Sequence, residues 1–156
     1  MGRPSKSRSA ERSSKPGAAN PYRAYGGKAL LTLNRKPLFA ELAVRAMLKR
    51  EGWNGVWVDS YGRKYRVGMP HTDEPITLPP NEEKLLKRIR EKAGRNGGCF
   101  DVFAWRGKKH RFIELKRSGK DRIRETQKRW LAAALHCGIR MRDLLIVEWN
   151  ITNKSG

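Results

Sequence analysis

Three residues could together bind a metal ion and activate water: Asp101, Glu114 and Lys116. Residues 98–116 contain two runs rich in Phe, Val, Ile and Trp, and Gly107 between them suits the first central position of a type II′ turn. In the predicted antiparallel hairpin, Lys116 shares a face with Glu114 because side chains alternate along a strand. The expected pairs are Arg106–Lys109, Trp105–His110, Phe103–Phe112 and Asp101–Glu114.

Two carboxylates directly opposite each other in a sheet repel, and a divalent cation between them would remove that cost. Hard oxygen ligands suit Mg²⁺ or Mn²⁺, so we expect Asp101, Glu114 and the carbonyl of Leu115 to hold such an ion. Lys116 would then orient or deprotonate the attacking water. The alternative is a solvated hairpin face on which these charges only keep the strand soluble.

Two predicted helices would place further polar groups near this hairpin. The first covers residues 37–51, and Glu41 lies at the edge of its apolar stripe. The second runs from about 122 to 136, and Gln127 interrupts its apolar inner face. A buried amide needs partners, and Gln127 could reach the region of Lys116. The alternatives are that Glu41 is only a first-turn residue, where the helix dipole favours a negative charge, and that Gln127 bonds a loop carbonyl.

These motifs resemble the PD-(D/E)xK nuclease superfamily, which has an Asp on one strand and a Glu-x-Lys motif on the next. Here the motifs are Asp101 and Glu114-Leu115-Lys116. The helix that follows carries Gln127-x-x-Trp-Leu, and this makes the chain similar to the VRR-NUC (virus-type replication-repair nuclease) branch over roughly residues 38–148. Phe100 stands where the superfamily name has Pro, which is not a metal ligand.

The resemblance implies an α/β fold with a restriction-endonuclease-like core, in which helices flank a mixed central β-sheet. It implies that Glu41 is a third acidic group that acts on the metal through water, and it places Gln127 near the same site. It further implies a Mg²⁺-dependent DNA endonuclease. Small stand-alone relatives look like homodimers that cut branched DNA, such as four-way junctions, in replication, recombination and repair, often in phages and bacteria.

Composition points to a polyanionic partner. The chain has 35 Lys and Arg against 15 Asp and Glu, a net charge of +20, so nucleic acid is the leading partner and an anionic membrane surface the alternative. No apolar run approaches a membrane span, and the first residues do not resemble a secretory signal. Cys99 and Cys137 are expected to be buried, reduced thiols. We therefore expect a cytoplasmic protein, associated with the nucleoid or in the host cytoplasm if phage-encoded.

The chain is expected to divide into a disordered basic arm, residues 1–28, and one nuclease domain, residues 29–156. A hairpin over 53–69, a helix over 82–94 and a strand over 144–147 covered on both faces complete the expected domain. Asp59 is interpreted as a turn former. Phosphate contacts are expected from basic residues near these elements: Arg63, Lys64, Arg66, Arg88, Arg117 and Lys120.

Two rival functions follow from the same composition. The first is a module with a nuclease-like fold that binds nucleic acid without cutting it. The second is a structural basic protein of a ribosome or nucleoid, which would explain the charge but not the opposed carboxylates. The sequence also does not distinguish RNA from DNA as the substrate, since no residue is identified that would contact a 2′-hydroxyl.

Overall fold

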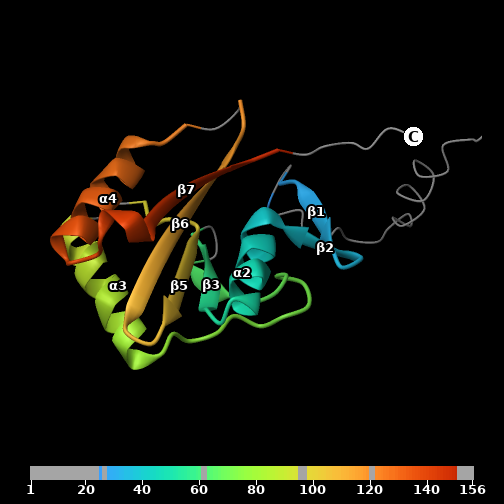
Figure 1. Ribbon diagram of the computed structural model, residues 1–156, viewed down its shortest axis with the longest axis horizontal. Coiled ribbons are helices and arrows are strands. Elements are labelled where there is room, and N and C mark those ends of the chain that lie inside the picture. The colour runs from blue at the N-terminus through green and yellow to red at the C-terminus, as the bar shows by residue number, and fades with distance from the viewer. Residues whose placement is uncertain (1–24, 26–27, 61–62, 95–97, 120–121, 151–156) are drawn as a thin grey trace, which may run out of the picture.

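The computed structural model describes residues 25, 28–60, 63–94, 98–119 and 122–150. Figure 1 shows a central sheet with α2 on one face and with α3 and α4 on the other. Apart from Tyr25 and Lys28, the predicted basic arm lies outside the described residues. The described helices are α2 (Ala40–Arg50), α3 (Pro80–Ala93), α4 (Glu125–His136) and the short 3-10 helix η2 (Met141–Asp143).

The central sheet has five strands in the order β4-β3-β5-β6-β7. All neighbours pair antiparallel except β6 and β7, which are parallel and are joined through α4. This mixed sheet between helices confirms the predicted α/β class. The strands are β3 (Asn54–Asp59), β4 (Lys64–Arg66), β5 (Val102–Arg106), β6 (Lys109–Arg117) and β7 (Leu144–Trp149).

The β5–β6 hairpin has the predicted register. Arg106 pairs with Lys109 across the turn, Phe103 pairs with Phe112, and Gly107 has a positive φ of 60° as a two-residue turn requires. The pairing ends at Val102, so Asp101 lies just before β5 and outside the ladder.

Aromatic packing between the sheet and the α3–α4 layer fixes the position of β6. The ring centroids of Phe103 and Phe112 are 4.5 Å apart, and Trp130 of α4 packs on Phe112 at the same 4.5 Å. Because side chains alternate, Glu114 and Lys116 follow Phe112 on this face. The apolar core therefore leads directly into a polar region at the end of β6.

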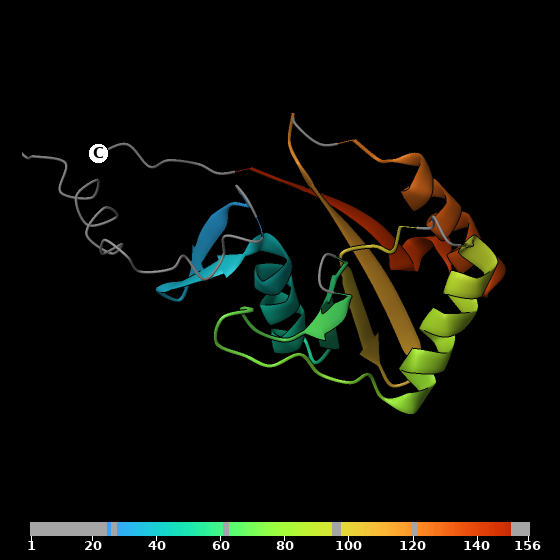
Figure 2. The same ribbon diagram turned by 180° about the vertical axis from the view of Figure 1, so that it is seen from behind.

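A second hairpin precedes α2 and was not predicted from the sequence. Strands β1 (Leu30–Leu33) and β2 (Lys36–Phe39) pair antiparallel, and Figure 2 shows them beside α2. Asn34 and Arg35 between them have φ values of 52° and 65°, which fits a type I′ turn. The first helix therefore begins at Ala40, not at residue 37.

Two further expectations need correction. Helix α3 begins at Pro80 rather than at residue 82, because proline is well suited to the first helical position. Strand β7 was expected to be covered on both faces, but it is the edge strand of the sheet. Its side chains Ile146 and Val147 are 47% and 37% exposed, so the apolar run is only partly buried.

Candidate active site

Asp101 and Glu114 are held together by hydrogen bonds between side chain and backbone. The Asp101 amide donates to Glu114 Oε1 at 3.2 Å, and the Leu115 amide donates to Asp101 Oδ2 at 2.9 Å. The Asp101 carbonyl accepts a bond of 2.8 Å from the Val58 amide, which ties it to β3. The structure thus brings the two acids together as the sequence predicted, although Asp101 lies just outside the strand.

Lys116 and Gln127 complete a buried polar cluster around Glu114. Lys116 Nζ lies 3.0 Å from Glu114 Oε2 and donates a 3.0 Å hydrogen bond to Gln127 Oε1. Gln127 Nε2 in turn donates to Glu114 Oε2. These three residues are only 2–8% exposed. Each polar contact therefore forms away from bulk water, which strengthens it.

The start of α4 explains why Gln127 is so well fixed. Gln127 is the third residue of the helix, and its Oε1 accepts a 3.0 Å bond from the Arg124 amide. This contact forms one half of a capping box, which satisfies a backbone donor at the helix N-terminus. One amide side chain therefore caps α4 and contacts both Glu114 and Lys116.

Glu41 reaches the same region from α2. It is 5% exposed and forms an ion pair with Lys28. Its other oxygen, Oε1, is buried and has no hydrogen-bond partner among the described residues. An unsatisfied carboxylate oxygen in a buried position is costly, so this oxygen has unused capacity to bind a water or a cation.

Lys28 was assigned to the basic arm, so its place at the site was not predicted. Its Nζ also lies 5.5 Å from the ring centroid of Phe39 and 5.6 Å from that of Trp57. These contacts position the ammonium group beside Glu41. No sequence signal separates Lys28 from the many basic residues that precede it.

One cavity of about 700 Å³ connects these groups. Asp101, Glu114, Lys116, Gln127 and Glu41 all line it, and we call it the catalytic cavity. Among the lining residues that were not predicted, three are basic: Lys28, Arg122 and Arg124. Both arginines are exposed, so their guanidinium groups can reach a phosphate at the mouth of the cavity.

Burial shapes the electrostatics of the two acids. It raises the pKa of Asp101 to about 8, with the negative charge of Glu114 as the next cause, while the Leu115 amide acts in the opposite direction. Two neighbouring buried carboxylates do not both ionise readily without a compensating cation. The donor set therefore suits a hard divalent ion, and the free Glu41 oxygen adds to that capacity.

The ligand set is small. Among the described residues, no group of three or more His, Cys, Asp or Glu side chains has the arrangement of a ready metal cluster. The Leu115 amide faces Asp101, and the carbonyl of a strand residue points to the same side as its amide. The available oxygens are thus those of Asp101, Glu114 and the Leu115 carbonyl, and Glu41 lines the same cavity.

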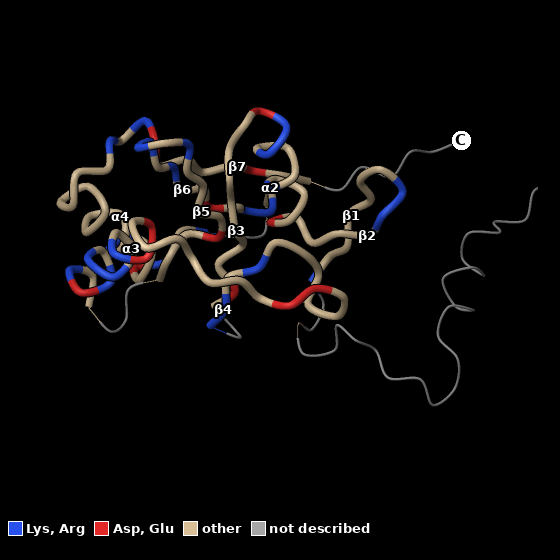
Figure 3. Tube along the Cα trace, turned by 90° about the horizontal axis from the view of Figure 1, so that it is seen from below, with Lys and Arg blue, Asp and Glu red and all other residues tan. Residues whose placement is uncertain are grey.

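The residues expected to bind DNA have different environments. Arg63, Lys64 and Arg88 are exposed, and Arg117 is half-buried with its guanidinium 5.6 Å from the ring centroid of Trp149. Figure 3 shows Lys and Arg on α3 and beside β2 and β4. Lys120 lies outside the described residues.

Arg66 and Asp59 do not lie where they were expected. Arg66 is 7% exposed, and its Nε donates to Asp59 Oδ2 at 2.8 Å. Asp59 is 1% exposed and also accepts a 2.7 Å bond from the Tyr25 hydroxyl. Asp59 is therefore a buried ion-pair partner rather than a turn former, and Arg66 is not on the surface.

Comparison with known proteins gives one match. A family model for the VRR-NUC domain matches residues 62–144, which is more than half of the chain. No curated protein and no solved structure matches. The matched region contains Asp101, Glu114, Lys116 and Gln127, whereas Glu41 precedes it. Within the part of the chain that the structure describes, no helix has the length and apolar character needed to cross a bilayer.

Proposed function

The chain belongs to the VRR-NUC family, a family of nucleases, and we propose that it is a Mg²⁺- or Mn²⁺-dependent endonuclease that hydrolyses phosphodiester bonds in branched DNA. One observation carries the proposal: two acids, a lysine and a glutamine contact one another in a single cavity. This combination serves phosphodiester hydrolysis, because phosphate charge must be neutralised while water is activated.

The acids supply the metal site. Asp101, Glu114 and the carbonyl of Leu115 would hold the cation, and Glu41 would act on it through water with its free oxygen. A bound Mg²⁺ or Mn²⁺ would polarise the scissile phosphate and lower the pKa of the attacking water. In the absence of that ion, Lys116 balances the charge of Glu114 and Gln127 donates a hydrogen bond to it.

Lys116 would position the attacking water and offset the charge that grows on the phosphate. Its ammonium has three donors, and Glu114 Oε2 and Gln127 Oε1 engage it at 3.0 Å each. A third donor direction can serve the water or a phosphate oxygen. Gln127 would act as a positioning residue, because it fixes the direction of the ammonium group.

The proposed substrate is DNA read by shape rather than by sequence. Exposed Arg122 and Arg124 line the catalytic cavity, and together with Arg63, Lys64 and Arg88 they would contact backbone phosphates, which carry no sequence information. The net charge of +20 favours such contacts. Such a protein would act on nucleic acid in the cytoplasm.

We further propose that two copies form a homodimer. The edge strand β7 presents the exposed apolar side chains Ile146 and Val147, and an open apolar edge favours pairing with another chain. Two-fold symmetry would present two equivalent catalytic cavities to the matched strands of a four-way junction.

A second candidate function is a DNA-binding module without catalysis. Glu114 is already engaged by Lys116, Gln127 and the Asp101 amide, so its charge is balanced without any metal. In this alternative Lys116 replaces the cation, and the site is purely structural. Metal dependence of cleavage separates the two functions.

The test is a cleavage assay on wild type, Lys116→Ala and Lys108→Ala. Lys108 lies in the β5–β6 turn, at the other end of the strand that carries Lys116, so its loss removes the same charge away from the cavity. Labelled linear duplex, single strand, flap and four-way junction are incubated with Mg²⁺, Mn²⁺ or EDTA. We expect metal-dependent cutting by wild type and Lys108→Ala, with a preference for branched DNA.

The outcomes are distinct. Loss of cutting in Lys116→Ala with unchanged DNA binding supports the nuclease. Equal cutting by all three proteins would indicate a contaminating nuclease and reject the assignment of the site. If none of them cuts while all bind, the non-catalytic module is the better description.

A further inference from the structure

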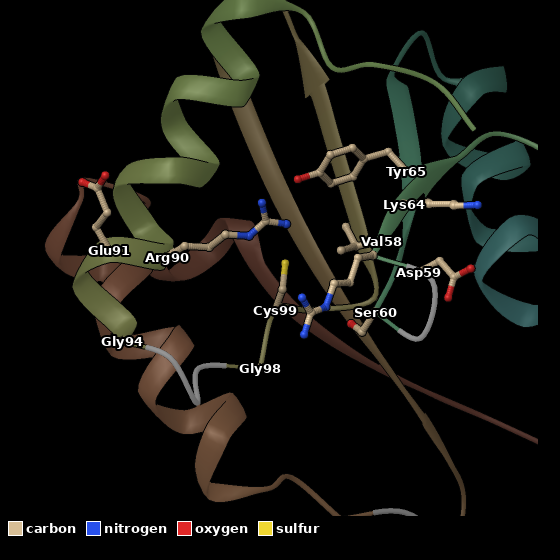
Figure 4. A pocket seen from close by; sticks show the side chains of 11 residues that line it. Val58, Asp59, Ser60, Lys64, Tyr65, Arg90, Glu91, Gly94, Gly98 and Cys99 are labelled. Carbon is tan, nitrogen blue, oxygen red and sulfur yellow. The ribbon is translucent and has the colours of Figure 1, made fainter. Parts of the chain in front are cut away.

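A second pocket lies beside the catalytic cavity and has no part in the chemistry proposed above. It has a volume of about 820 Å³ and lies between α3 and the β3–β4 hairpin. Figure 4 shows this space, with α3 on one side and the sheet on the other. Ser60, Gly98 and Cys99 line both this pocket and the catalytic cavity. A ligand in the pocket would therefore lie next to the proposed site of cleavage.

Two flat side chains meet inside this pocket. Tyr65 projects from β4 and Arg90 from α3, and Figure 4 shows them reaching toward each other. The guanidinium carbon of Arg90 lies 5.5 Å from the ring centroid of Tyr65. Nucleobases stack on aromatic rings and on guanidinium planes, so this pair offers the two kinds of surface that an unstacked base uses.

The wall next to this pair is apolar and uncharged. Val58 is 6% exposed and Cys99 is half-buried, and both side chains line the pocket. An uncharged wall suits the ring of a base rather than a phosphate or a metal ion.

Charge around the pocket suits the phosphate attached to such a base. Arg63, Lys64 and Arg90 line it and outnumber its two acids, Asp59 and Glu91. Asp59 is, in addition, already neutralised by its buried ion pair. The volume falls within the range typical of small-ligand pockets and leaves room for a whole nucleotide.

We propose that this pocket binds an unpaired nucleobase of the substrate DNA, next to the phosphate that is cut. The proposal rests on the nuclease function and specifies its substrate class: DNA in which a nucleotide is free to leave the stack at the branch point. A base in a continuous duplex must first be unstacked and unpaired, whereas an unpaired base enters at little cost. A DNA with an unpaired base at its branch point should therefore bind more tightly than a continuous duplex.

The test is a binding assay in EDTA, which needs no cleavage. One branched DNA carries two unpaired nucleotides at its branch point, and a matched DNA has the same backbone with abasic residues at those positions. Since stacking of one base contributes about 1–3 kcal/mol, wild type should bind the first DNA about 5- to 150-fold more tightly. Tyr65→Leu should remove the preference, and Tyr65→Phe, which keeps the ring, should retain it.

A pair of variants on α3 separates stacking from charge. Arg90→Ala and Lys87→Ala each remove one positive charge from an exposed position of the same helix, but only Arg90 lines the pocket. Arg90→Ala should reduce the preference for the DNA with bases, whereas Lys87→Ala should weaken binding of both DNAs equally. Thermal melting of each variant verifies that it is folded.

Three results would overturn the proposal. The first is equal affinity of wild type for the two DNAs. The second is a full preference retained by folded Tyr65→Leu. The third is that free dAMP competes with the labelled branched DNA as strongly as the unlabelled DNA does, which would assign the pocket to mononucleotides. Cleavage of the same DNAs in Mg²⁺ is measured separately. If the protein cuts DNA but shows no base preference in binding, the pocket proposal is rejected and the nuclease proposal stands. If it shows the base preference but does not cut, the nuclease proposal is rejected and base binding by the pocket stands.

Discussion

Lys116 Nζ donates a 3.0 Å hydrogen bond to Gln127 Oε1, so helix α4 fixes the ammonium group of strand β6. The same Gln127 oxygen accepts the Arg124 amide, and the Gln127 amide group donates to Glu114. The position of the lysine thus depends on the helix cap. The lysine proposed to position the attacking water is thus oriented by a residue of the neighbouring helix.

Gln127→Ala should lower kcat about 10- to 100-fold, because groups that orient catalytic side chains have effects of this size. It should also remove half of the capping box and cost about 1 kcal/mol of stability. Gln127→Glu is the matched variant: its carboxylate can still cap α4 but would repel Glu114. Cleavage rates and thermal melting should therefore show an active-site defect in both variants and a capping defect only in Gln127→Ala. A rate loss explained fully by unfolded protein would contradict the positioning role.

Lys28→Met should destabilise the metal-free protein by about 1–3 kcal/mol, because it leaves the buried carboxylate of Glu41 without its cation. Methionine keeps an apolar stem against Phe39 and Trp57. If Glu41 acts on the metal, Mg²⁺ should reduce the difference in melting temperature between wild type and variant. The double variant Lys28→Met, Glu41→Gln should regain stability in EDTA. A melting difference that is identical with and without Mg²⁺ would count against the role of Glu41.

The raised pKa of Asp101 predicts a pH-dependent stability in EDTA. The folded state keeps this proton up to a pH of about 8, whereas the unfolded state loses it near the usual carboxyl pKa of 3.8. The folded state therefore binds more protons between these values, and stability falls as pH rises through this window. Melting curves of wild type and Asp101→Asn measure this pH dependence. The stability of wild type relative to the variant should fall from pH 5 to pH 8.5.

Mg²⁺ should reverse this trend, because the ion binds the ionised carboxylates and releases the proton. The metal-induced rise in melting temperature should therefore increase with pH for wild type and be much smaller for Asp101→Asn. A metal effect of the same size at pH 5 and pH 8.5 would exclude Asp101 as a ligand.

Lys64 and Arg66 are neighbours on β4 and should behave in opposite ways. Arg66→Ala leaves the buried Asp59 carboxylate without its cation and should cost about 3–5 kcal/mol of stability. Lys64→Ala removes an exposed charge, so it should leave the melting temperature nearly unchanged. Lys64→Ala should instead reduce the slope of log K against log[salt] for DNA binding by about 1. The reverse pattern would show that Arg66 contacts DNA.

Ile146→Lys should convert the proposed homodimer into a monomer, because it places a charge on the apolar edge of β7. Sedimentation velocity measures the change, and Thr32→Lys on the separate β1–β2 sheet is the control. A wild type that is monomeric at micromolar concentration would rule out the dimer, and with it the symmetric cutting of a junction.

The sequence predicted the parts of the site that rest on local patterns. Alternation along residues 110–116 and the turn at Gly107 were enough to place Glu114 and Lys116 on one face. The polar Gln127 in an apolar row was enough to predict that it could reach the region of Lys116. The β1–β2 hairpin was missed because Arg35 is an unusual residue for a positive φ. Without that hairpin, nothing indicated that Lys28 would reach Glu41.

The remaining differences come from tertiary contacts. Arg66 and Asp59 are both charged, and charged residues are rarely buried unless they are paired, so neither could be assigned to the interior before the partner was known. The apolar run of β7 looked like a covered strand, yet its exposure depends on sheet order, which hydrophobicity alone does not determine. The Tyr65–Arg90 pair likewise joins elements that are distant in the chain.

The parallel pairing of β6 with β7 has a consequence for how the protein folds. Asp101, Glu114, Lys116 and Gln127 lie at the β5–β6 hairpin and on the helix that follows it in the chain, so their contacts close only short loops and can form early. Strand β7 can pair with β6 only after α4, which joins the two strands, has packed on the sheet. Helix α2 comes from a more distant part of the chain. Amide protons of the β5–β6 ladder should consequently be among the last to exchange with solvent, so the β5–β6 hairpin should persist when the edges of the molecule open transiently.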